Sequence, residues 1–284
     1  MSRPTAEAPP PASNTQIGTL LREWRSARGL SQLALALEAD VSPRHISYVE
    51  TGKAQPSREM VSRLADALGM PLREHNTLLH AAGYAPRYPE TPLSTPRLMQ
   101  ARRAIDFILA QQEPYPAFVI NRRWDVLLAN QGAVRFAMYL HGPSAHTNML
   151  HQVFDPNDLR QHIVNWEEIA GDLIRHLHDE IAASASDGEL RALLEEVLRY
   201  PDVPQKWRVR DVESEPSPLL TTVFRKNGQE LRFFSTITTF VTSRDVTLDE
   251  LRIECTFPAD DATAALCRTL AASTAEDVPN RGMP

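Results

Sequence analysis

Apolar residues recur with helical spacing over residues 31–52, SQLALALEADVSPRHISYVETG. Leu33, Ala36 and Leu37 fall at i, i+3 and i+4, so they share one face of a first helix. A second helix points two apolar residues inward at i and i+3, Ile46 and Val49. The pattern predicts two short helices that pack against each other around a tight turn.

Polar residues mark the ends of these two helices. Ser31 and Ser42 suit N-cap positions, and Pro43 suits the first turn of the second helix. Asp40 stands where the chain must reverse, and Asp is among the residues that enter the left-handed region most readily after Gly. Gly52 suits a left-handed stop at the end of the second helix. The segment therefore predicts a helix-turn-helix.

The outer face of the second helix carries residues with the chemistry to bind DNA. Arg44 can donate two hydrogen bonds to guanine O6 and N7. Ser47 and Tyr48 can donate to base edges or phosphate oxygens. Gln32, in the first turn of the preceding helix, can reach a phosphate or an adenine, and the helix dipole there favours an anion. The alternative interpretation is a solvated outer face without a ligand.

A longer stretch, residues 16–84, resembles the Xre/Cro-type (phage repressor) helix-turn-helix and covers five helices. The resemblance implies DNA contacts at Gln32, Ser42, Pro43, Arg44, Ser47 and Tyr48. It also implies a structural ion pair between Arg25 on the first helix and Glu50 at the end of the recognition helix. The chain departs from the family at Asp40, where Gly is usual, and at Pro43, where a hydrogen-bonding side chain is usual.

The charge is unevenly distributed along the 284 residues. Residues 1–85 carry 9 Lys and Arg against 8 Asp and Glu, a net charge of +1, whereas residues 86–284 carry 21 against 28, a net charge of −7. The acidic part would repel DNA. Because the helix-turn-helix is barely basic, we expect modest affinity for each monomer and a need for a homodimer.

Prolines and the spacing of apolar residues indicate the elements of the second part of the chain. A proline-rich linker at 85–95 precedes a helix at 96–112, whose apolar stripe packs either on its own domain or on a second subunit. A hairpin (117–120 and 124–130) comes before helices at 132–140, at 166–183 and after Asp187. Strands follow at 219–225, 231–240 and 251–257, with Asn227-Gly228 as a hairpin turn, and Asp260 caps a last helix to about 272.

This order predicts an α+β chain in which an all-α five-helix domain precedes a PAS-like α/β domain, an antiparallel sheet of about five strands with helices inserted on one face. The runs YPAFVINRRWDVLLAN, NWEEIAGDLIRHLHDE, KWRVRDV and ELRFFSTITTF resemble the MmyB-like transcription-regulator ligand-binding domain over roughly 97–258. That resemblance implies a PAS-like fold fused to an Xre-type helix-turn-helix, and a small apolar ligand with fatty acid as the favoured class.

Large aromatic residues and Met suit an adaptable apolar pocket, and paired Arg residues suit an acidic head group. The alternative is that the former are ordinary core and the latter are solvated. The candidate ligand-binding residues are Phe118, Arg122, Arg123, Trp124, Phe136, Met149, Phe154, Trp166, Trp207 and Phe233.

Other chemistry finds little support in the sequence. His176 and His178 point to different helix faces, and three further His residues, 141, 146 and 151, lack ligand spacing, so no metal is expected. There is no P-loop, Rossmann glycine pattern or nucleophile elbow, so we expect neither an enzyme nor a cofactor other than a bound apolar ligand. Cys255 and Cys267 indicate a reducing compartment without a disulfide framework.

These observations favour a one-component transcriptional regulator that binds a double-stranded DNA operator as a homodimer and senses an apolar effector. The alternative is a constitutive regulator whose second domain only dimerises or binds a partner protein. We expect disordered tails at 1–14 and 273–284, a DNA-binding domain at 15–84 and a ligand-binding domain at 96–272. Without a signal peptide or an apolar run near 18 residues, a cytoplasmic, nucleoid-associated protein is expected.

Overall fold

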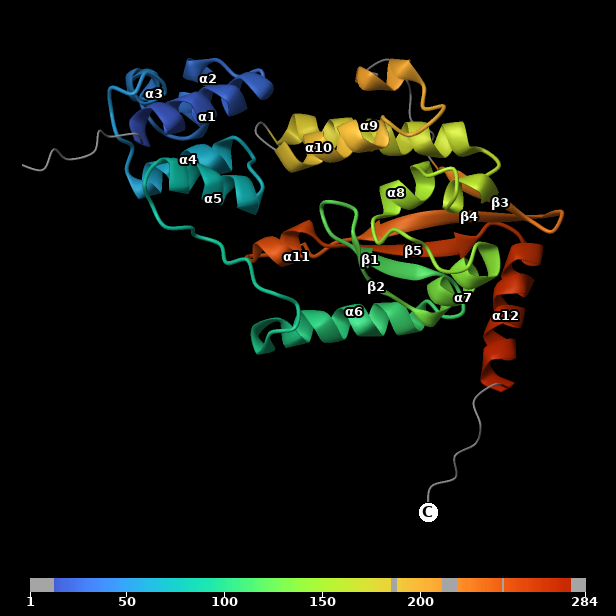
Figure 1. Cartoon of the computed structure of the whole chain (residues 1–284). Coiled ribbons are helices and arrows are strands. Elements are labelled where there is room, and N and C mark those ends of the chain that lie inside the picture. Colours follow the sequence, from blue (N-terminus) through green and yellow to red (C-terminus); the bar gives the residue numbers. More distant parts are fainter. Residues whose placement is uncertain (1–12, 185–187, 211–218, 242, 277–284) are drawn as a thin grey trace, which may run out of the picture. The chain divides into compact units, whose positions relative to one another are not determined.

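The computed structural model describes residues 13–184, 188–210, 219–241 and 243–276. Contacts divide the chain into two compact units, one with five helices and one with a five-stranded sheet and further helices (Figure 1). The α+β class predicted from the sequence is therefore confirmed.

The first unit is the helical one. Its helices are α1 (Ser13–Ala27), α2 (Gln32–Glu38), α3 (Pro43–Glu50), α4 (Arg58–Ala67) and α5 (Leu72–Ala81). Their inward faces share one hydrophobic cluster, whose fully buried members include Ile17, Leu21, Leu35, Ile46 and Leu64. Burial of these side chains fixes the position of α3 against α1, because interiors pack closely and tolerate few voids.

The turn between α2 and α3 has the predicted chemistry. The Ser31 hydroxyl accepts a hydrogen bond from the Ala34 N–H at 3.0 Å, and Ser42 accepts from the His45 N–H at 3.2 Å. Asp40 has φ +51° and Gly52 has φ +72°. Both N-caps and both left-handed positions are thus confirmed.

The predicted apolar face of α2 is confirmed at Ala36 and wrong at its two leucines. Ala36 is buried, but Leu33 and Leu37 are 59% and 75% exposed, and Leu35 fills the core in their place. Leucine occupies positions 33, 35 and 37 of this seven-residue helix, so the spacing alone admits two faces. Packing against α3 and α4 selects the face centred on Leu35.

The remaining elements include five strands. In chain order they are η1 (Pro96–Leu98), α6 (Met99–Gln111), β1 (Ala117–Ile120), β2 (Val126–Ala129), α7 (Gln131–Leu140), α8 (Met149–Phe154), η2 (Leu159–His162), α9 (Trp166–Ala183), α10 (Gly188–Val197), η3 (Gln205–Arg208), β3 (Thr221–Lys226), β4 (Gln229–Thr238), α11 (Val246–Glu250), β5 (Arg252–Pro258) and α12 (Asp261–Glu276).

The strands form one antiparallel sheet in the order β2-β1-β5-β4-β3. Lys226 pairs with Gln229 across the turn, where Asn227 and Gly228 both have positive φ, +51° and +79°. Two such residues give the turn whose twist matches that of a hairpin. The helices α7 to α10 lie in the sequence between β2 and β3, so the predicted sheet with inserted helices is confirmed.

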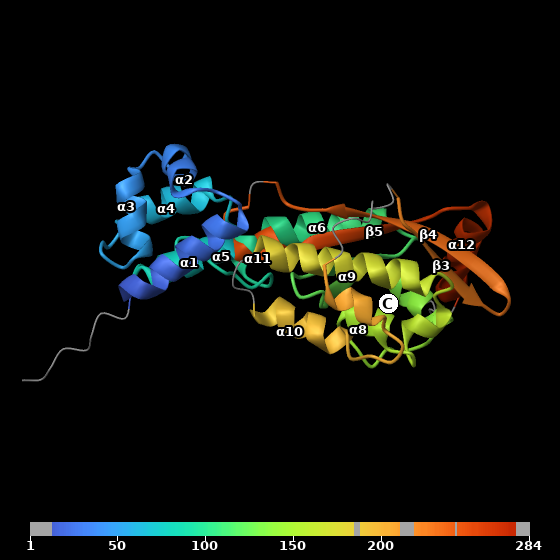
Figure 2. The same ribbon diagram turned by 90° about the horizontal axis from the view of Figure 1, so that it is seen from above.

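The two faces of the sheet are covered by different helices. Ile105 and Leu109 of α6 share a hydrophobic cluster with Val119, Ile253 and Cys255, so the apolar stripe of α6 packs on its own sheet. Figure 1 shows α6 on one side of the sheet and α8, α9 and α10 on the other, and Figure 2 shows α9 running along the sheet.

Several predicted boundaries shift. β2 begins at Val126 rather than Trp124, because Trp124 has φ +67° and belongs to the turn. The last helix continues to Glu276 instead of ending near 272. The proposed cap Asp187, and residues 1–12 and 277–284 of the proposed tails, lie outside the described residues.

Candidate functional site

The exposed face of α3 presents Arg44 at its centre. The Arg44 Nε donates a hydrogen bond to the Tyr48 hydroxyl at 2.9 Å, and its guanidinium carbon lies 5.2 Å from the centroid of that ring. Ser42 and Pro43 are also exposed, while Ser47 is half-buried. The contact with Tyr48 restricts the rotamers of Arg44, which lowers the entropy cost of placing this side chain against a base.

A buried carboxylate stands behind α3. Arg25 Nε and Nη2 donate to the two oxygens of Glu50 at 2.7 and 3.0 Å, Gln32 donates its amide at 2.9 Å, and Arg22 lies 3.7 Å away. Burial raises the pKa of Glu50, but the hydrogen bonds from Arg25 and Gln32 outweigh it, so the pKa lies below the usual range. The network fixes α1, α2 and α3 together and orients the Gln32 amide.

A second charged group lies in the second unit, on the sheet face that looks toward α9. Arg252 of β5 forms an ion pair with Glu180 of α9, and the guanidinium carbon is 5.9 Å from the centroid of the Trp124 ring. His176, one turn earlier on α9, places Nε2 at 3.4 Å from Glu180 and packs edge-on against Trp124. Burial raises the pKa of Glu180, yet hydrogen bonding to His176 and the charge of Arg252 lower it overall.

Glu254 lies two residues further along the same face. Its register partners are Phe118 on β1 and Ile237 on β4, and Ile237 is 49% exposed. Burial raises the pKa of Glu254, and a hydrogen bond with Ser235 opposes this rise only in part. The pKa of this carboxyl therefore lies above the usual range for Glu, beside an accessible apolar side chain.

The structure does not gather the candidate ligand-binding residues into one place. The ring centroids of Phe136 and Phe233 lie 4.9 Å apart in a core cluster between α7, β4 and α12. Phe154, Trp166 and Trp207 form a row of aromatic rings with centroid distances of 5.9 and 5.8 Å. The others lie near the sheet face that looks toward α9 or at its edge: Phe118, Trp124 and Met149.

The two arginines proposed as head-group anchors already face carboxylates. Arg122 lies 3.6 Å from Glu250, with both side chains mostly buried, and the half-exposed Arg123 lies 3.9 Å from Glu189. A ligand carboxylate would compete with an existing acidic partner at either arginine. Neither is a strong anchor in this arrangement.

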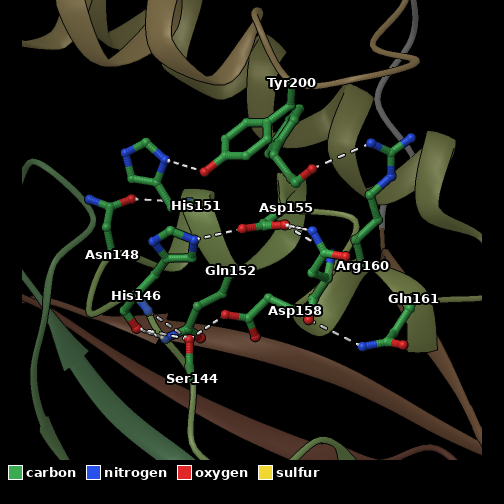
Figure 3. Close-up of polar contacts among 12 residues, drawn as sticks. Ser144, His146, Asn148, His151, Gln152, Asp155, Asp158, Arg160, Gln161 and Tyr200 are labelled. Atoms are coloured by element: carbon green, nitrogen blue, oxygen red, sulfur yellow. Dashed lines mark hydrogen bonds and ion pairs between the residues drawn. The ribbon is translucent and has the colours of Figure 1, made fainter.

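A polar network holds the segment around α8 (Figure 3). His146 Nε2 lies 2.9 Å from Asp155 Oδ2, and His151 Nδ1 lies 3.0 Å from the Tyr200 hydroxyl. The bond with His146 lowers the pKa of Asp155. Asn148 caps α8 and donates its amide to the Arg123 carbonyl at 2.6 Å. The network thereby connects α8 to the backbone next to Trp124.

The histidines of this segment have separate acidic neighbours. His141 lies 3.7 Å from Asp158, His151 lies 3.4 Å from Glu196, and His146 is paired with Asp155. Across the described part of the chain, no three His, Cys, Asp or Glu residues form a group that could hold a metal ion.

The family models match both units. The model described as a helix-turn-helix domain matches residues 16–78, and the model of the MmyB-like transcription regulator ligand binding domain matches residues 101–270. The chain belongs to the MmyB-like transcription regulators. This MmyB-like regulator thus combines a DNA-binding helix-turn-helix with a ligand-binding domain. None of its described helices has both the length and the hydrophobicity to span a membrane.

Two curated relatives and one solved structure each match about a quarter of the chain. A protein of Yarrowia lipolytica provisionally named multi-protein-binding factor 1 is 33% identical over 64 residues, 22% of this chain and 42% of that protein. Endothelial differentiation-related factor 1 of Homo sapiens is 27% identical over 73 residues, 26% of this chain and 49% of that protein. The chain spans less than half the length of these curated relatives. The solved structure of the clp gene regulator ClgR from C. glutamicum is 32% identical, covering 27% of this chain and 96% of that one, with a TM-score of 0.23.

Sequence reasoning missed Arg252, Glu180 and Glu254. A signal was present, because the alternation that turns Ile253 and Cys255 toward α6 turns Arg252 and Glu254 toward the inserted helices. A charged residue on a covered sheet face needs a partner, so such positions are candidates for a site.

Proposed function

We propose that this MmyB-like regulator binds operator DNA through α3 and changes its DNA binding when a small apolar ligand occupies the C-terminal domain. The observation that carries the proposal is the pair of family matches, one on each unit. DNA binding is assigned to residues 15–84 and ligand binding to residues 96–272, with the linker at 85–95. A ligand acts only if it binds the two states of the regulator unequally.

The proposed DNA contacts follow the exposed end of the helix-turn-helix. Arg44 reads a base edge, and the other contacts come from Gln32, Ser42, Pro43, Ser47 and Tyr48. The Gln32 Nε2 donates one of its two N–H groups to Glu50, so the second N–H and the carbonyl oxygen remain for DNA. Recognition helices of this kind work as dimers on two half-sites one helical turn apart.

Arg44→Ala is expected to weaken binding to the selected operator by about 1–3 kcal/mol and to relax the preference at one base position. The reason is the loss of a two-pronged contact with a guanine edge. Operator selection followed by competition binding at fixed salt measures both effects. Arg191→Ala, an exposed position on α10, is the matched control and should bind like the wild type. Equal weakening on all DNA sequences would instead identify Arg44 as a phosphate contact.

Fatty acid is the proposed ligand class, because the MmyB-like resemblance implies it. We expect C10–C18 fatty acids to raise the melting temperature of the full chain and organic extraction of the purified protein to release a bound lipid. Thermal melts with each acid and mass spectrometry of the extract test this. The absence of both a shift and a lipid would contradict ligand sensing.

One observation favours the alternative in which the second domain serves dimerisation. α6 buries its stripe on the sheet yet leaves Phe107 66% exposed and Met99 45% exposed on the outside. An exposed aromatic side chain on a helix suits an interface between copies. Phe107→Glu would then lower the apparent mass in sedimentation, whether or not lipid is present.

A further inference from the structure

The backbone at Trp124 is held in an unfavourable conformation. Its φ of +67° is uncommon for a bulky residue and is sterically strained. Three neighbours maintain it: the Trp124 N–H donates to the Asn121 carbonyl at 3.0 Å, the Met149 N–H donates to the Trp124 carbonyl at 2.8 Å, and Asn148 holds the preceding carbonyl. A maintained conformation of this kind is a reason to look for a function in the side chain.

The same residue carries a polar atom without a partner. Trp124 is 4% exposed, and its Nε1 has no hydrogen-bond acceptor among the described residues. Arg252, beside the ring, has the same property at Nη1, although its Nη2 donates to Glu180. Buried donors are nearly always satisfied, and a donor without an acceptor is destabilising. Glu180 Oε2, in the same cluster, is also without a partner, so two donors face one unpaired acceptor atom. A bound group that brings a further acceptor would satisfy the donor that is left over.

We propose that the indole N–H of Trp124 and the free N–H of Arg252 bind the carboxylate of an acyl-chain ligand. An arginine that uses one nitrogen for Glu180 retains another for a second anion, and a carboxylate accepts from several donors at once. The inference rests on the proposed ligand-sensing function and names the head group and its contacts.

The surroundings of Arg252 fit an acyl chain with an acidic end. Glu254, two residues along the strand, has a raised pKa because of burial, which lessens repulsion of an anionic ligand. Phe118 and the half-exposed Ile237 flank Glu254 in register and offer an apolar surface for the chain. His176 Nε2 lies 3.4 Å from Glu180, so Arg252 is not the only neighbour of that carboxylate.

The test compares three ligands of one chain length on the full chain freed of lipid: dodecanoic acid, methyl dodecanoate and dodecan-1-ol. Trp124→Phe removes the indole N–H but keeps an aromatic ring. Arg252→Lys keeps a positive charge next to Glu180 but replaces the two-nitrogen fork with a single nitrogen, which cannot face Glu180 and the ligand from two separate positions. The control is Arg232→Lys on the exposed surface of β4, paired with Glu230. Calorimetric titration gives the dissociation constants, and thermal melts verify that each variant is folded.

We expect the wild type to bind the acid at least tenfold more tightly than the alcohol or the ester. Each of Trp124→Phe and Arg252→Lys should raise the dissociation constant of dodecanoic acid by about tenfold, since a hydrogen bond to a charged group contributes about that much. The dissociation constant of dodecan-1-ol should stay within twofold of the wild-type value. Arg232→Lys should leave all three dissociation constants unchanged.

Two other results overturn the inference. If the acid and the alcohol bind the wild type equally, or both variants keep the acid affinity, an ordered water fills the cluster and the carboxylate binds elsewhere or not at all. If none of the three compounds binds the wild type, ligand sensing itself fails and the carboxylate site with it. The first result leaves the proposed function standing, so the two failures are distinguishable.

Discussion

Replacing Arg25 by Met is expected to lower the free energy of unfolding of the first unit by about 3 kcal/mol. The Glu50 side chain is 1% exposed and accepts two hydrogen bonds from Arg25, so the variant would bury a carboxylate without its main partner. Removal of one partner of a buried pair typically costs about 3–5 kcal/mol. The lower end applies because Gln32 and Arg22 remain near Glu50.

Hydrogen exchange of the α1–α5 amides on the full chain measures this loss without separating the two units. The matched control is Arg58→Met, an exposed arginine in the first turn of α4, which should leave exchange unchanged. The double variant Arg25→Met/Glu50→Met should regain most of the stability, because two apolar side chains can replace a buried pair at little cost. If the amides of Arg25→Met exchange as slowly as those of the wild type, Arg25 makes no net contribution to the stability of the first unit.

The Arg25–Glu50 pair also makes the stability of the first unit depend on pH, in a direction that can be predicted. The folded pKa of Glu50 lies below that of the unfolded chain, near 4.3 for Glu. Its stabilisation is thus fully present above the unfolded pKa and is lost as the pH falls through the folded pKa. Because Arg25→Met removes the largest opposing hydrogen bond and leaves burial in place, the folded pKa of Glu50 rises toward the unfolded value or above it, so acidification should cost this variant less stability than it costs the wild type.

The sequence predicts what local chemistry determines. Ser31, Asp40 and Ser42 act through their own backbone neighbours, so the turn between α2 and α3 could be predicted from residue type. The Asn227-Gly228 turn and the alternation along β5 likewise follow from two or three adjacent residues. The order of these signals was enough to predict a five-stranded sheet with inserted helices.

The site of the second unit depends on residues far apart in the chain. Trp124, Glu180 and Arg252 come from a turn, a helix and a strand, and only the folded sheet brings them together. The spacing of residues along the sequence cannot predict that a buried N–H lacks an acceptor. The same limit explains α2, where Leu33 and Leu35 are equivalent by spacing and the packing of neighbouring helices decides which is buried.

Gly18→Ala should destabilise the first unit by about 3 kcal/mol, at the upper end for an overpacked core position. A Cβ at Gly18 would lie 2.6 Å from the Val49 carbonyl oxygen and 2.8 Å from that of Glu50. Both atoms are backbone of α3, so no rotamer change relieves the contact and the two helices must separate. Glu50 is also the ion-pair partner of Arg25, and the separation would lengthen that pair.

Operator binding should fall together with stability, because α3 carries the proposed contact Arg44 and its position depends on α1. Gly188→Ala is the matched control, since a Cβ there meets nothing within 4 Å at the start of α10. The control should stabilise slightly, by up to about 1 kcal/mol, through the helix propensity of Ala. Denaturant unfolding and operator titration of both variants measure the two effects. A Gly18→Ala variant with wild-type stability and operator affinity would mean that α1 and α3 do not approach as closely as the Val49 and Glu50 distances require.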